Sequence, residues 1–478
     1  MLFNTFEFLL FFPVVTLLYH LTPRPWRWLL LLLASCVFYM AFIPVYIFIL
    51  VFTITVDYLA GLGIEKSAGR RRKLFLLFSI AANLGMLCVF KYYDFFTLQV
   101  NHLLHLSGSR EHLPYLALLL PVGLSFHTFQ SLSYTLEVYH GRQKAERHYG
   151  FLALYVLFYP QLVAGPIERP QHLLPQLHAP QPFSPGLFSS GLRLMAWGLF
   201  KKSVIADRAA ECSDALFSHP QRYSGWPLWV GVLLFSIQIY CDFSGYADMA
   251  IGSARTMGIQ LSLNFRRPYF AHSIAELWQR WHMSLYRWFR DYVYIPLGGN
   301  RVSKVRQKLN VLFVFLLSGL WHGANWTYIC YGFCHGIMYN LSTWHRISWK
   351  AAWTRPFRIL FTFLLLSLAY IFFRARSLSD AGYIFLHLLD TSSAVAYGTV
   401  LYGFRAGIHF YSHTDWFILL GSILLLFITE GLQEYGFRPE WRLLKLPLWL
   451  RWPAYYAFFF ALAFLGVYEH RAFVYFSF

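Results

Sequence analysis

Long apolar runs separated by short polar segments extend from one end of the sequence to the other. A helix needs about 20 mostly apolar residues to cross the hydrocarbon core of a bilayer. Candidate crossings lie near residues 6–21, 27–43, 45–63, 73–92, 112–138, 149–164, 186–203, 226–251, 309–345, 356–374, 415–432 and 450–468. The pattern predicts an all-α, polytopic membrane bundle with about eleven transmembrane crossings, forming one domain over residues 1–478.

Two of these runs are unlike simple spanning helices. Residues 112–138 contain Pro-Val-Gly at 121–123, and residues 309–345 carry no charged side chain yet are far too long for one crossing. The glycines and asparagine of GLWHGANW, residues 319–326, supply a break in the second run. Irregular backbone at membrane depth survives only inside protein or beside a water-filled cavity. We therefore expect broken or re-entrant helices around a central tunnel.

The composition is also typical of a protein embedded in a lipid bilayer. The chain is 57% hydrophobic and only 13% charged, whereas soluble proteins carry about 25% charged residues. The formal net charge of +18 is explained by basic cytoplasmic loops facing anionic lipid rather than by nucleic-acid binding. The first apolar segment lacks a basic n-region and a cleavage site, so we expect it to be a retained span.

Lysine and arginine cluster after the first, third and fifth candidate spans, which predicts an N-terminus on the outer side of the membrane and these loops in the cytoplasm. The basic residues concerned are Arg24, Arg27, Lys66, Arg70, Arg71, Arg72, Lys73, Arg142, Lys144 and Arg147. Two clusters, 70–73 and 201–202, have two interpretations. In the first, they only set the topology. In the second, they also attract the phosphates or the acidic surface of an acyl donor.

A first group of polar residues interrupts the apolar run around 238–252. Asp242, Ser244, Tyr246 and Asp248 fall in this segment, and we expect Gly245 to break the helix. Ionisable residues at membrane depth are functional candidates because each is costly to bury. A polar network that packs helices together is the alternative, and the sequence leaves both open.

A second group lies between Ser273 and Asn300. At 100° per residue, one helix would place Glu276, Arg280, Arg287, Arg290 and Asp291 on a charged stripe, with Trp278, Trp281, Leu285, Trp288, Phe289 and Tyr292 opposite. This pattern predicts an amphipathic helix at the membrane interface. His282 falls on the aromatic side, where it is either a core histidine or a functional one.

The third group centres on His322, which the predicted break leaves deep in the membrane at the end of an apolar helix. A neutral imidazole there can act as general base for a hydroxyl or thiol acceptor. Two other constellations are weaker. Cys330, Cys334 and His335 lack a fourth metal ligand at familiar spacing, and a triad of Ser244, His322 and Asp242 lacks the G-x-S-x-G elbow.

With these residues identified, the sequence resembles the membrane-bound O-acyltransferase (MBOAT) family, most closely its alginate O-acetyltransferase (AlgI) branch and more distantly its DltB branch. The matching segments are LPVGLSFHTFQSLSYTLEVYHG from Leu120, FYPQLVAGPIERP from Phe158, QIYCDFSGYADMAIG from Gln238, NFRRPYFAHSIAELWQRWHMSLYRWFRDYVYIPLGGNR from Asn264 and SGLWHGANWTYICYGFCHG from Ser318. The sequence departs from the family pattern at His127, where tyrosine is more usual, and at Cys241, where a larger residue is common.

The resemblance implies a helical bundle whose motif region spans about 238–340, with His322 of the WHG motif and His282 of the RWHxSL motif as catalytic residues. The residues that we expect to bind the substrate or line the tunnel around them are Asp242, Ser244, Tyr246, Trp281, Arg290, Asp291, Trp321 and Asn325. Asn325 or a backbone N–H at the break is a candidate for stabilising a developing oxyanion.

The implied reaction moves an acetyl group from a cytoplasmic donor across the bacterial inner membrane, for O-acetylation of an exported polysaccharide such as alginate. Acetyl-CoA or another acyl thioester is the expected donor, with no permanently bound cofactor and no metal. Expected partners are a periplasmic SGNH-type acetyltransferase, the polysaccharide synthesis and export machinery and membrane lipids, without nucleic acid. The alternatives are DltB-like D-alanyl transfer and a non-enzymatic transporter or export scaffold.

The C-terminal tail is aromatic, with Phe473, Tyr475, Phe476 and Phe478 following the last candidate span. One interpretation is an interfacial belt that anchors the last helix. The family resemblance suggests instead a tail that docks at the tunnel mouth on the extracytoplasmic side. Eleven crossings from an outside N-terminus would end in the cytoplasm, so this second interpretation needs one extra crossing or re-entrant element.

Overall fold

Helices form all the regular structure in the part of the chain that the structure describes. The structure is a computed structural model that describes residues 1–478 except 180–181, 345–351, 392–411, 438–444, 469–472 and 475–478. Its α-helices are α1 (Phe6–Leu21), α2 (Arg27–Met40), α3 (Ile47–Lys66), α4 (Gly69–Leu87), α5 (Tyr93–Leu106), α6 (Leu124–Tyr139), α7 (Tyr149–Leu157), α8 (Tyr159–Leu162), α9 (Pro170–His178), α10 (Pro185–Leu199), α11 (Asp207–Ser218), α12 (Trp226–Thr256), α13 (Ile274–Arg280), α14 (Met283–Phe289), α15 (Lys304–His322), α16 (Trp326–Trp344), α17 (Arg355–Arg374), α18 (Leu378–His387), α21 (His413–Glu434) and α23 (Leu448–Leu465). The predicted all-α class is confirmed.

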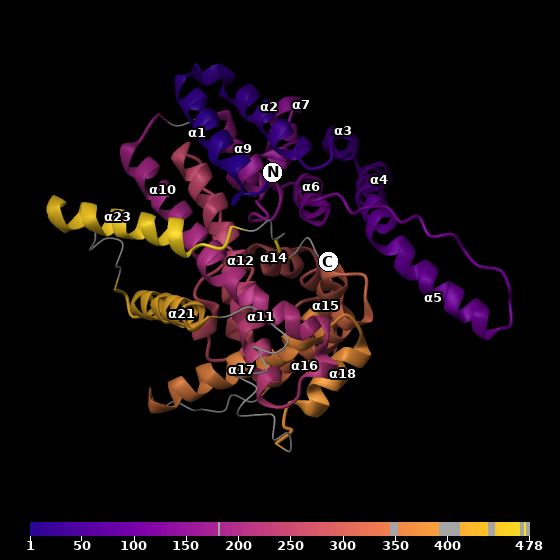
Figure 1. Ribbon diagram of the computed structural model, residues 1–478. Coiled ribbons are helices and arrows are strands. Elements are labelled where there is room, and N and C mark those ends of the chain that lie inside the picture. Colours follow the sequence, from indigo (N-terminus) through magenta and orange to yellow (C-terminus); the bar gives the residue numbers. More distant parts are fainter. Residues whose placement is uncertain (180–181, 345–351, 392–411, 438–444, 469–472, 475–478) are drawn as a thin grey trace.

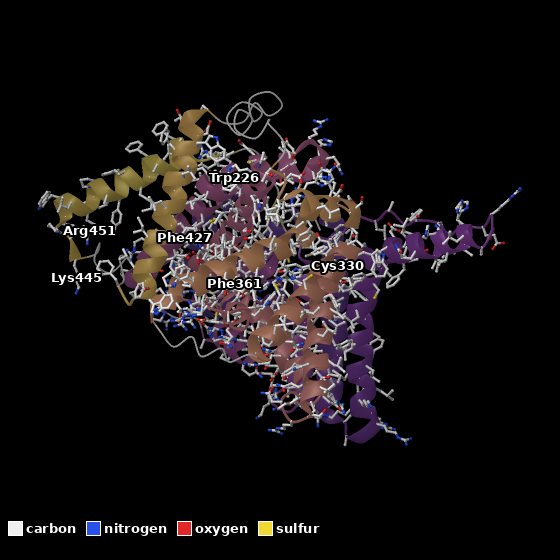
Figure 2. All side chains as sticks on the ribbon, turned by 90° about the horizontal axis from the view of Figure 1, so that it is seen from below. Trp226, Cys330, Phe361, Phe427, Lys445 and Arg451 are labelled. Atoms are coloured by element: carbon white, nitrogen blue, oxygen red, sulfur yellow. The ribbon has the colours of Figure 1, made fainter. Side chains whose placement is uncertain are left out.

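In the described part of the chain, six helical segments are long and apolar enough to cross a membrane: Pro44–Lys66, Gly69–Leu106, Trp226–Thr256, Arg355–Arg374, Thr414–Glu434 and Leu448–Leu465. The exposed faces of α21 and α23 carry large apolar side chains, as a lipid-facing surface requires. Phe417 on α21 and Phe464 on α23, for example, are 78% and 79% exposed, and both helices lie at the edge of the molecule away from α5 (Figure 2). The predicted number of about eleven crossings remains a prediction.

The 31-residue helix α12 runs through the middle of the molecule (Figure 1). Its first half, including Phe235 and Cys241, packs into a core built with α11, α13 and α17. Its second half, including Phe243 and Tyr246, packs into another core built with α1, α2, α6 and α7. The two cores therefore meet along α12, near Cys241 and Phe243.

The helices α10 and α12 cross at two pairs of glycines. A Cβ on Gly245 would lie 2.6 Å from the carbonyl oxygen of Gly198, and one on Gly252 would lie 2.7 Å from that of Gly191. Helix α12 continues unbroken through Gly245, so the predicted break there is wrong. The glycine is needed for a close backbone approach, which small residues permit between membrane helices.

The candidate span at 112–138 is only half helical. Helix α6 begins after Gly123, which adopts a left-handed φ of 76° as its N-cap, whereas residues 109–121 form no helix. Before this segment, α4 continues through the π-turn Cys88–Tyr92 into α5, which projects away from the body of the molecule (Figure 1). The predicted break at 121–123 is confirmed.

The hairpin of α15 and α16 confirms the predicted break in the long uncharged run. Helix α15 ends at His322, and Gly323 follows in an extended conformation with φ −166° and ψ 153°. The two helices approach closely at small residues, because a Cβ on Gly332 would lie 2.3 Å from the carbonyl oxygen of Phe315. The hairpin thus fixes the position of His322 at the end of α15, next to α16.

Candidate active site

His322 is a buried histidine at the last position of α15. Its side chain is 4% exposed, and its ring centroid lies 5.3 Å from that of Phe373 and 6.0 Å from that of Tyr331, both in edge-to-face arrangements. These rings come from α17 and α16. These rings pack against the imidazole on two sides and shield it from bulk solvent.

Lys91 reaches the same helix end from the π-turn between α4 and α5. Its ammonium donates hydrogen bonds of 2.7 Å to the carbonyl oxygen of Trp321 and 3.0 Å to that of His322. The hydroxyl of Tyr92 donates to the preceding carbonyl, that of Leu320, at 2.8 Å. The last carbonyls of a helix lack partners within it, so these two neighbouring side chains anchor the C-terminus of α15.

Trp321 contacts both histidines that the sequence singled out. Its ring centroid is 4.9 Å from that of His322 and 6.1 Å from that of His282. Phe126 and Phe129 of α6 pack on the same indole at 5.3 and 5.5 Å. The predicted catalytic residues His322 and His282 are therefore brought together around one tryptophan.

His282 occupies a backbone break, which the sequence did not predict. It has a left-handed conformation with φ 40°, an uncommon state for a residue with a side chain, and it separates α13 from α14. Asn264 fixes this break, since its carbonyl oxygen accepts the N–H of Met283 at 2.9 Å and its Oδ1 accepts the Ser284 hydroxyl at 2.6 Å. The His282 side chain is 1% exposed, and neither ring nitrogen has a hydrogen-bond partner in the described structure.

The single amphipathic helix predicted for residues 273–300 is consequently wrong in two respects. The segment forms α13, α14 and the π-turn Arg290–Tyr294, and its aromatic side is buried in protein instead of facing the membrane interface. Trp281, for example, is 3% exposed and packs against Tyr269 and Tyr370. A tertiary contact from Asn264, distant in the sequence, overrides the helical periodicity.

A small pocket opens beside His322. It has a volume of about 60 Å³ and is lined by Lys91, Leu120, Pro121, Val122, Gly123, Leu124, Ser125, Phe126, Val163, Trp321 and His322. A pocket of this size accommodates a few water-sized groups. The irregular segment before α6 forms one wall, as expected for non-helical backbone that borders a cavity at membrane depth.

Asp242 and Ser244 belong to a buried ionic network between α12 and the π-turn Phe200–Ala206. Lys202 lies 2.7 Å from Asp242 and 2.8 Å from Asp207. Lys201 pairs with Asp248 at 2.8 Å and donates to the Ser244 hydroxyl at 2.9 Å. Here the polar packing network is what the structure shows.

The expectation that Lys201 and Lys202 form an accessible cytoplasmic cluster is wrong, because each is only 3% exposed. Their carboxylate partners neutralise them inside the protein. Arg71 and Lys73 of the other cluster are exposed, whereas Arg72 donates to the carbonyl oxygen of Tyr139 at 2.5 Å. Of these two clusters, the one at 70–73 is accessible to a soluble donor.

The described part of the C-terminal tail is buried against this network. The Val474 N–H donates to Asp242 Oδ2 at 2.7 Å. Phe473 is 1% exposed and packs on Phe243 and Tyr246 at centroid distances of 5.6 and 5.0 Å. Since the Phe243 ring lies 4.7 Å from that of His282, Phe473 supports a wall of the site. Tyr475, Phe476 and Phe478 lie outside the described residues.

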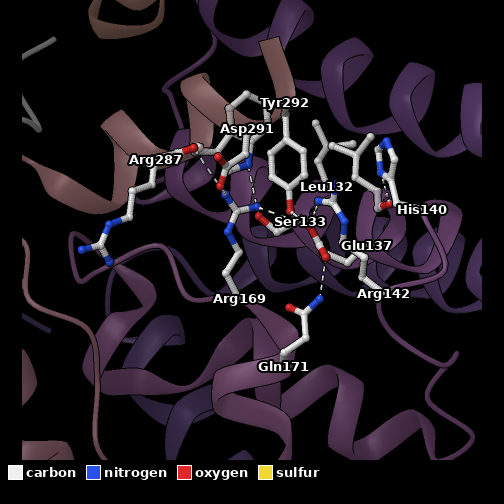
Figure 3. A network of polar contacts seen from close by, with 12 residues as sticks. Leu132, Ser133, Glu137, His140, Arg142, Arg169, Gln171, Arg287, Asp291 and Tyr292 are labelled. Atoms are coloured by element: carbon white, nitrogen blue, oxygen red, sulfur yellow. Dashed lines mark hydrogen bonds and ion pairs between the residues drawn. The ribbon is translucent and has the colours of Figure 1, made fainter. Parts of the chain in front are cut away.

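Asp291 belongs to a network of polar contacts that also contains Arg169, Glu137 and Tyr292 (Figure 3). Asp291 accepts from Arg290 at 2.8 Å and from Arg169 at 3.0 Å, and the Arg290 side chain is 48% exposed. Glu137 joins the network by accepting the hydroxyl of Tyr292 at 2.7 Å. These contacts tie the π-turn to α6 and do not place Arg290 or Asp291 in the pocket.

Asn325 caps α16 instead of facing the pocket. Its Oδ1 accepts the N–H of Thr327 at 3.1 Å, and its Nδ2 donates to the carbonyl oxygen of Arg376 at 3.2 Å. His335 accepts the indole N–H of Trp278 at 3.3 Å. Among the described residues, no group of three or more His, Cys, Asp or Glu is arranged to hold a metal ion.

Comparison with known proteins defines the class. Residues 74–343 match the model of the MBOAT, membrane-bound O-acyltransferase, family. The chain is 38% identical to the probable alginate O-acetylase AlgI of Azotobacter vinelandii over 79% of this chain and 75% of that protein. It is 36% identical to the peptidoglycan O-acetyltransferase of Helicobacter pylori over 80% of this chain and 78% of that protein. The teichoic acid D-alanyltransferase of Bacillus subtilis is 27% identical over 57% of this chain and 73% of that protein.

The chain belongs to the membrane-bound O-acyltransferase family, and it is a multi-pass membrane enzyme that transfers acyl groups to oxygen. A transporter or a purely structural scaffold is therefore set aside. Sequence reasoning missed Lys91, although a signal was available. Lys91 is an ionisable residue within the candidate span 73–92, and such residues are functional candidates by default.

Proposed function

We propose that the protein transfers an acetyl group from a cytoplasmic acyl thioester to a hydroxyl acceptor on the way to an exported polysaccharide, with His322 as the general base. The observation that carries the proposal is the position of His322, buried at the end of α15 beside a small pocket. A base at a backbone break inside the membrane domain can meet a donor and an acceptor that arrive from opposite sides.

An acetyl group suits the site. The pocket beside His322 has room for a few water-sized groups, which is enough for an acetyl group. Relatives named alginate O-acetylase and peptidoglycan O-acetyltransferase are 38% and 36% identical, whereas the D-alanyltransferase is 27% identical. Acetyl transfer is therefore favoured over D-alanyl transfer.

His282 is proposed as the second residue of the site, held beside Trp321 by its strained backbone. Strain of this kind persists where the surrounding structure fixes it and clusters at functional sites. Acetyl-CoA or another acyl thioester is the proposed donor, and the bacterial inner membrane is the proposed location. We further propose a periplasmic SGNH-type transferase as the partner that receives the acetyl group.

The proposal is tested by comparing the extracellular polysaccharide of a strain lacking the gene with that of the same strain carrying it on a plasmid. Loss of O-acetyl esters, quantified by release of acetate with mild alkali, and their return on complementation support acetyl transfer. Unchanged acetate in the extracellular polysaccharide, together with less ester-linked alanine in the cell wall, would support D-alanyl transfer instead.

A further inference from the structure

We infer that Lys91 is a catalytic residue that binds the carbonyl oxygen of the acyl group and stabilises the negative charge that forms on it during transfer. This inference rests on the proposed function of His322 and names the group that completes its site.

The ammonium of Lys91 has a donor to spare. An ammonium carries three N–H donors, and two of them bind the carbonyl oxygens of Trp321 and His322. No carboxylate of the described residues forms an ion pair with Lys91. The two carbonyl contacts hold the nitrogen in place beside His322, and the third donor is available to a ligand.

Lys91 and His322 line the same pocket, together with Trp321. A ligand in this pocket is therefore next to both the imidazole and the ammonium. Asn325, the side chain expected from the sequence to stabilise an oxyanion, is engaged in capping α16. The pocket thus offers the Lys91 nitrogen, held in place by two carbonyl oxygens, as the alternative donor, and a preorganised donor of this kind stabilises charge that develops in the transition state.

The presence of a charged residue in the apolar helical segment Gly69–Leu106 argues against a purely structural role. Tyr92 anchors the neighbouring carbonyl of Leu320 with a neutral hydroxyl, so capping this helix end does not require a charge. An ionisable residue at membrane depth costs a few kcal/mol. The positive charge is explained if it meets a negative charge during the reaction.

In the step we infer, His322 takes the proton from the acceptor hydroxyl as its oxygen forms a bond to the acyl carbon of the thioester. The electron pair of the carbonyl moves to its oxygen, which Lys91 holds by a hydrogen bond without giving up a proton. The carbonyl then re-forms, the carbon–sulfur bond breaks, and the leaving thiolate takes the proton from His322. The products are an oxygen ester and a free thiol.

The test uses inside-out membrane vesicles that contain the full-length protein. Radioactive acetyl-CoA is the probe, and the rate at which labelled acetyl groups enter the polymer is measured. Lys91→Met removes the charge, and Lys91→Gln keeps a neutral donor for the carbonyls of α15. Both should lower kcat by roughly 100- to 1,000-fold, the usual cost of losing an oxyanion donor, with KM for acetyl-CoA nearly unchanged.

Tyr92→Phe is the matched control, because it removes a hydrogen bond from the same helix end without altering the pocket. It should keep kcat near that of the wild type. Equal losses in Tyr92→Phe and both Lys91 variants would show that Lys91 is only a helix cap, and full activity in Lys91→Gln would also overturn the inference. If instead His322→Ala is as active as the wild type, the proposed function itself fails.

Discussion

The backbone N–H of Val474 donates a 2.7 Å hydrogen bond to the carboxylate of Asp242, a residue 232 positions earlier in the middle of α12. The same carboxylate pairs with Lys202 at 2.7 Å. This contact brings the end of the chain to the place where the two cores meet, one aromatic ring away from His282. The described part of the tail therefore forms part of the wall of the site. An aromatic belt at the membrane interface would not make these buried contacts.

Phe473→Ala tests this role of the tail. Because Phe473 is 1% exposed between Phe243 and Tyr246, its truncation should destabilise the protein by roughly 3 kcal/mol and reduce acetyl transfer. Phe464→Ala on α23 is the control, since that ring is 79% exposed. Thermal unfolding in detergent and incorporation of acetate in vesicles provide the two readouts. Equal behaviour of the two variants would exclude a role for the tail in the site.

The exposed basic residues at the start of α4 should steer an anionic donor toward the cytoplasmic face. Arg71→Glu combined with Lys73→Glu leaves Arg72 and its backbone contacts in place. We expect a weaker use of acetyl-CoA at low salt and a smaller difference at high salt, where the charges are screened.

Arg110→Glu is the control for this charge change, because Arg110 is also exposed but follows the fourth candidate span. Reporter fusions on both variants check that the orientation is unchanged. The same salt dependence in wild type and double variant would leave the cluster at 70–73 with only a topological role.

His172 makes stability depend on pH outside the spanning helices. Its hydrogen bond to the buried Glu168 carboxylate, 2.7 Å long, raises the pKa of His172 above its ordinary value of about 6.5. A pKa that is higher in the folded state means stabilisation that is fully present below about pH 6.5 and lost as the pH rises through the folded value. The effect is small because the imidazole is 46% exposed.

His172→Gln should remove this contribution. Between about pH 6 and about pH 8, the Tm of the wild type should fall more than that of the variant, measured in the same detergent. All other titrating groups are common to both proteins, so the difference isolates this pair. Parallel Tm profiles would mean that the Glu168 contact does not depend on the charge of His172.

Run length and glycine content were enough to predict the break after His322, because thirty-seven uncharged residues, from 309 to 345, exceed one crossing. The same reasoning failed at Gly245, where the missing side chain permits contact with Gly198 and the helix continues. A glycine can serve a turn or a close approach, and only the neighbouring helix decides which.

Contacts between distant segments explain the other differences. The break at His282 depends on Asn264, and no glycine or proline marks it locally. Lys201 and Lys202 look like a loop cluster, but aspartates on α11 and α12 bury them as ion pairs. The helical class and the two histidines followed from sequence patterns and motifs, whereas these pairings required the three-dimensional arrangement.

The assignment of His322 as general base is tested most directly by His322→Gln, which keeps a polar side chain but removes the basic nitrogen. His335→Gln is the matched control, because His335 is another fully buried histidine of the same hairpin and its bond from Trp278 can be made to a glutamine oxygen. Both variants are quantified in the membrane, and acetyl transfer from radioactive acetyl-CoA to polymer is measured in vesicles. We predict that His322→Gln loses roughly 100- to 10,000-fold in rate while His335→Gln stays active; a normal rate in well-inserted His322→Gln would contradict the assignment.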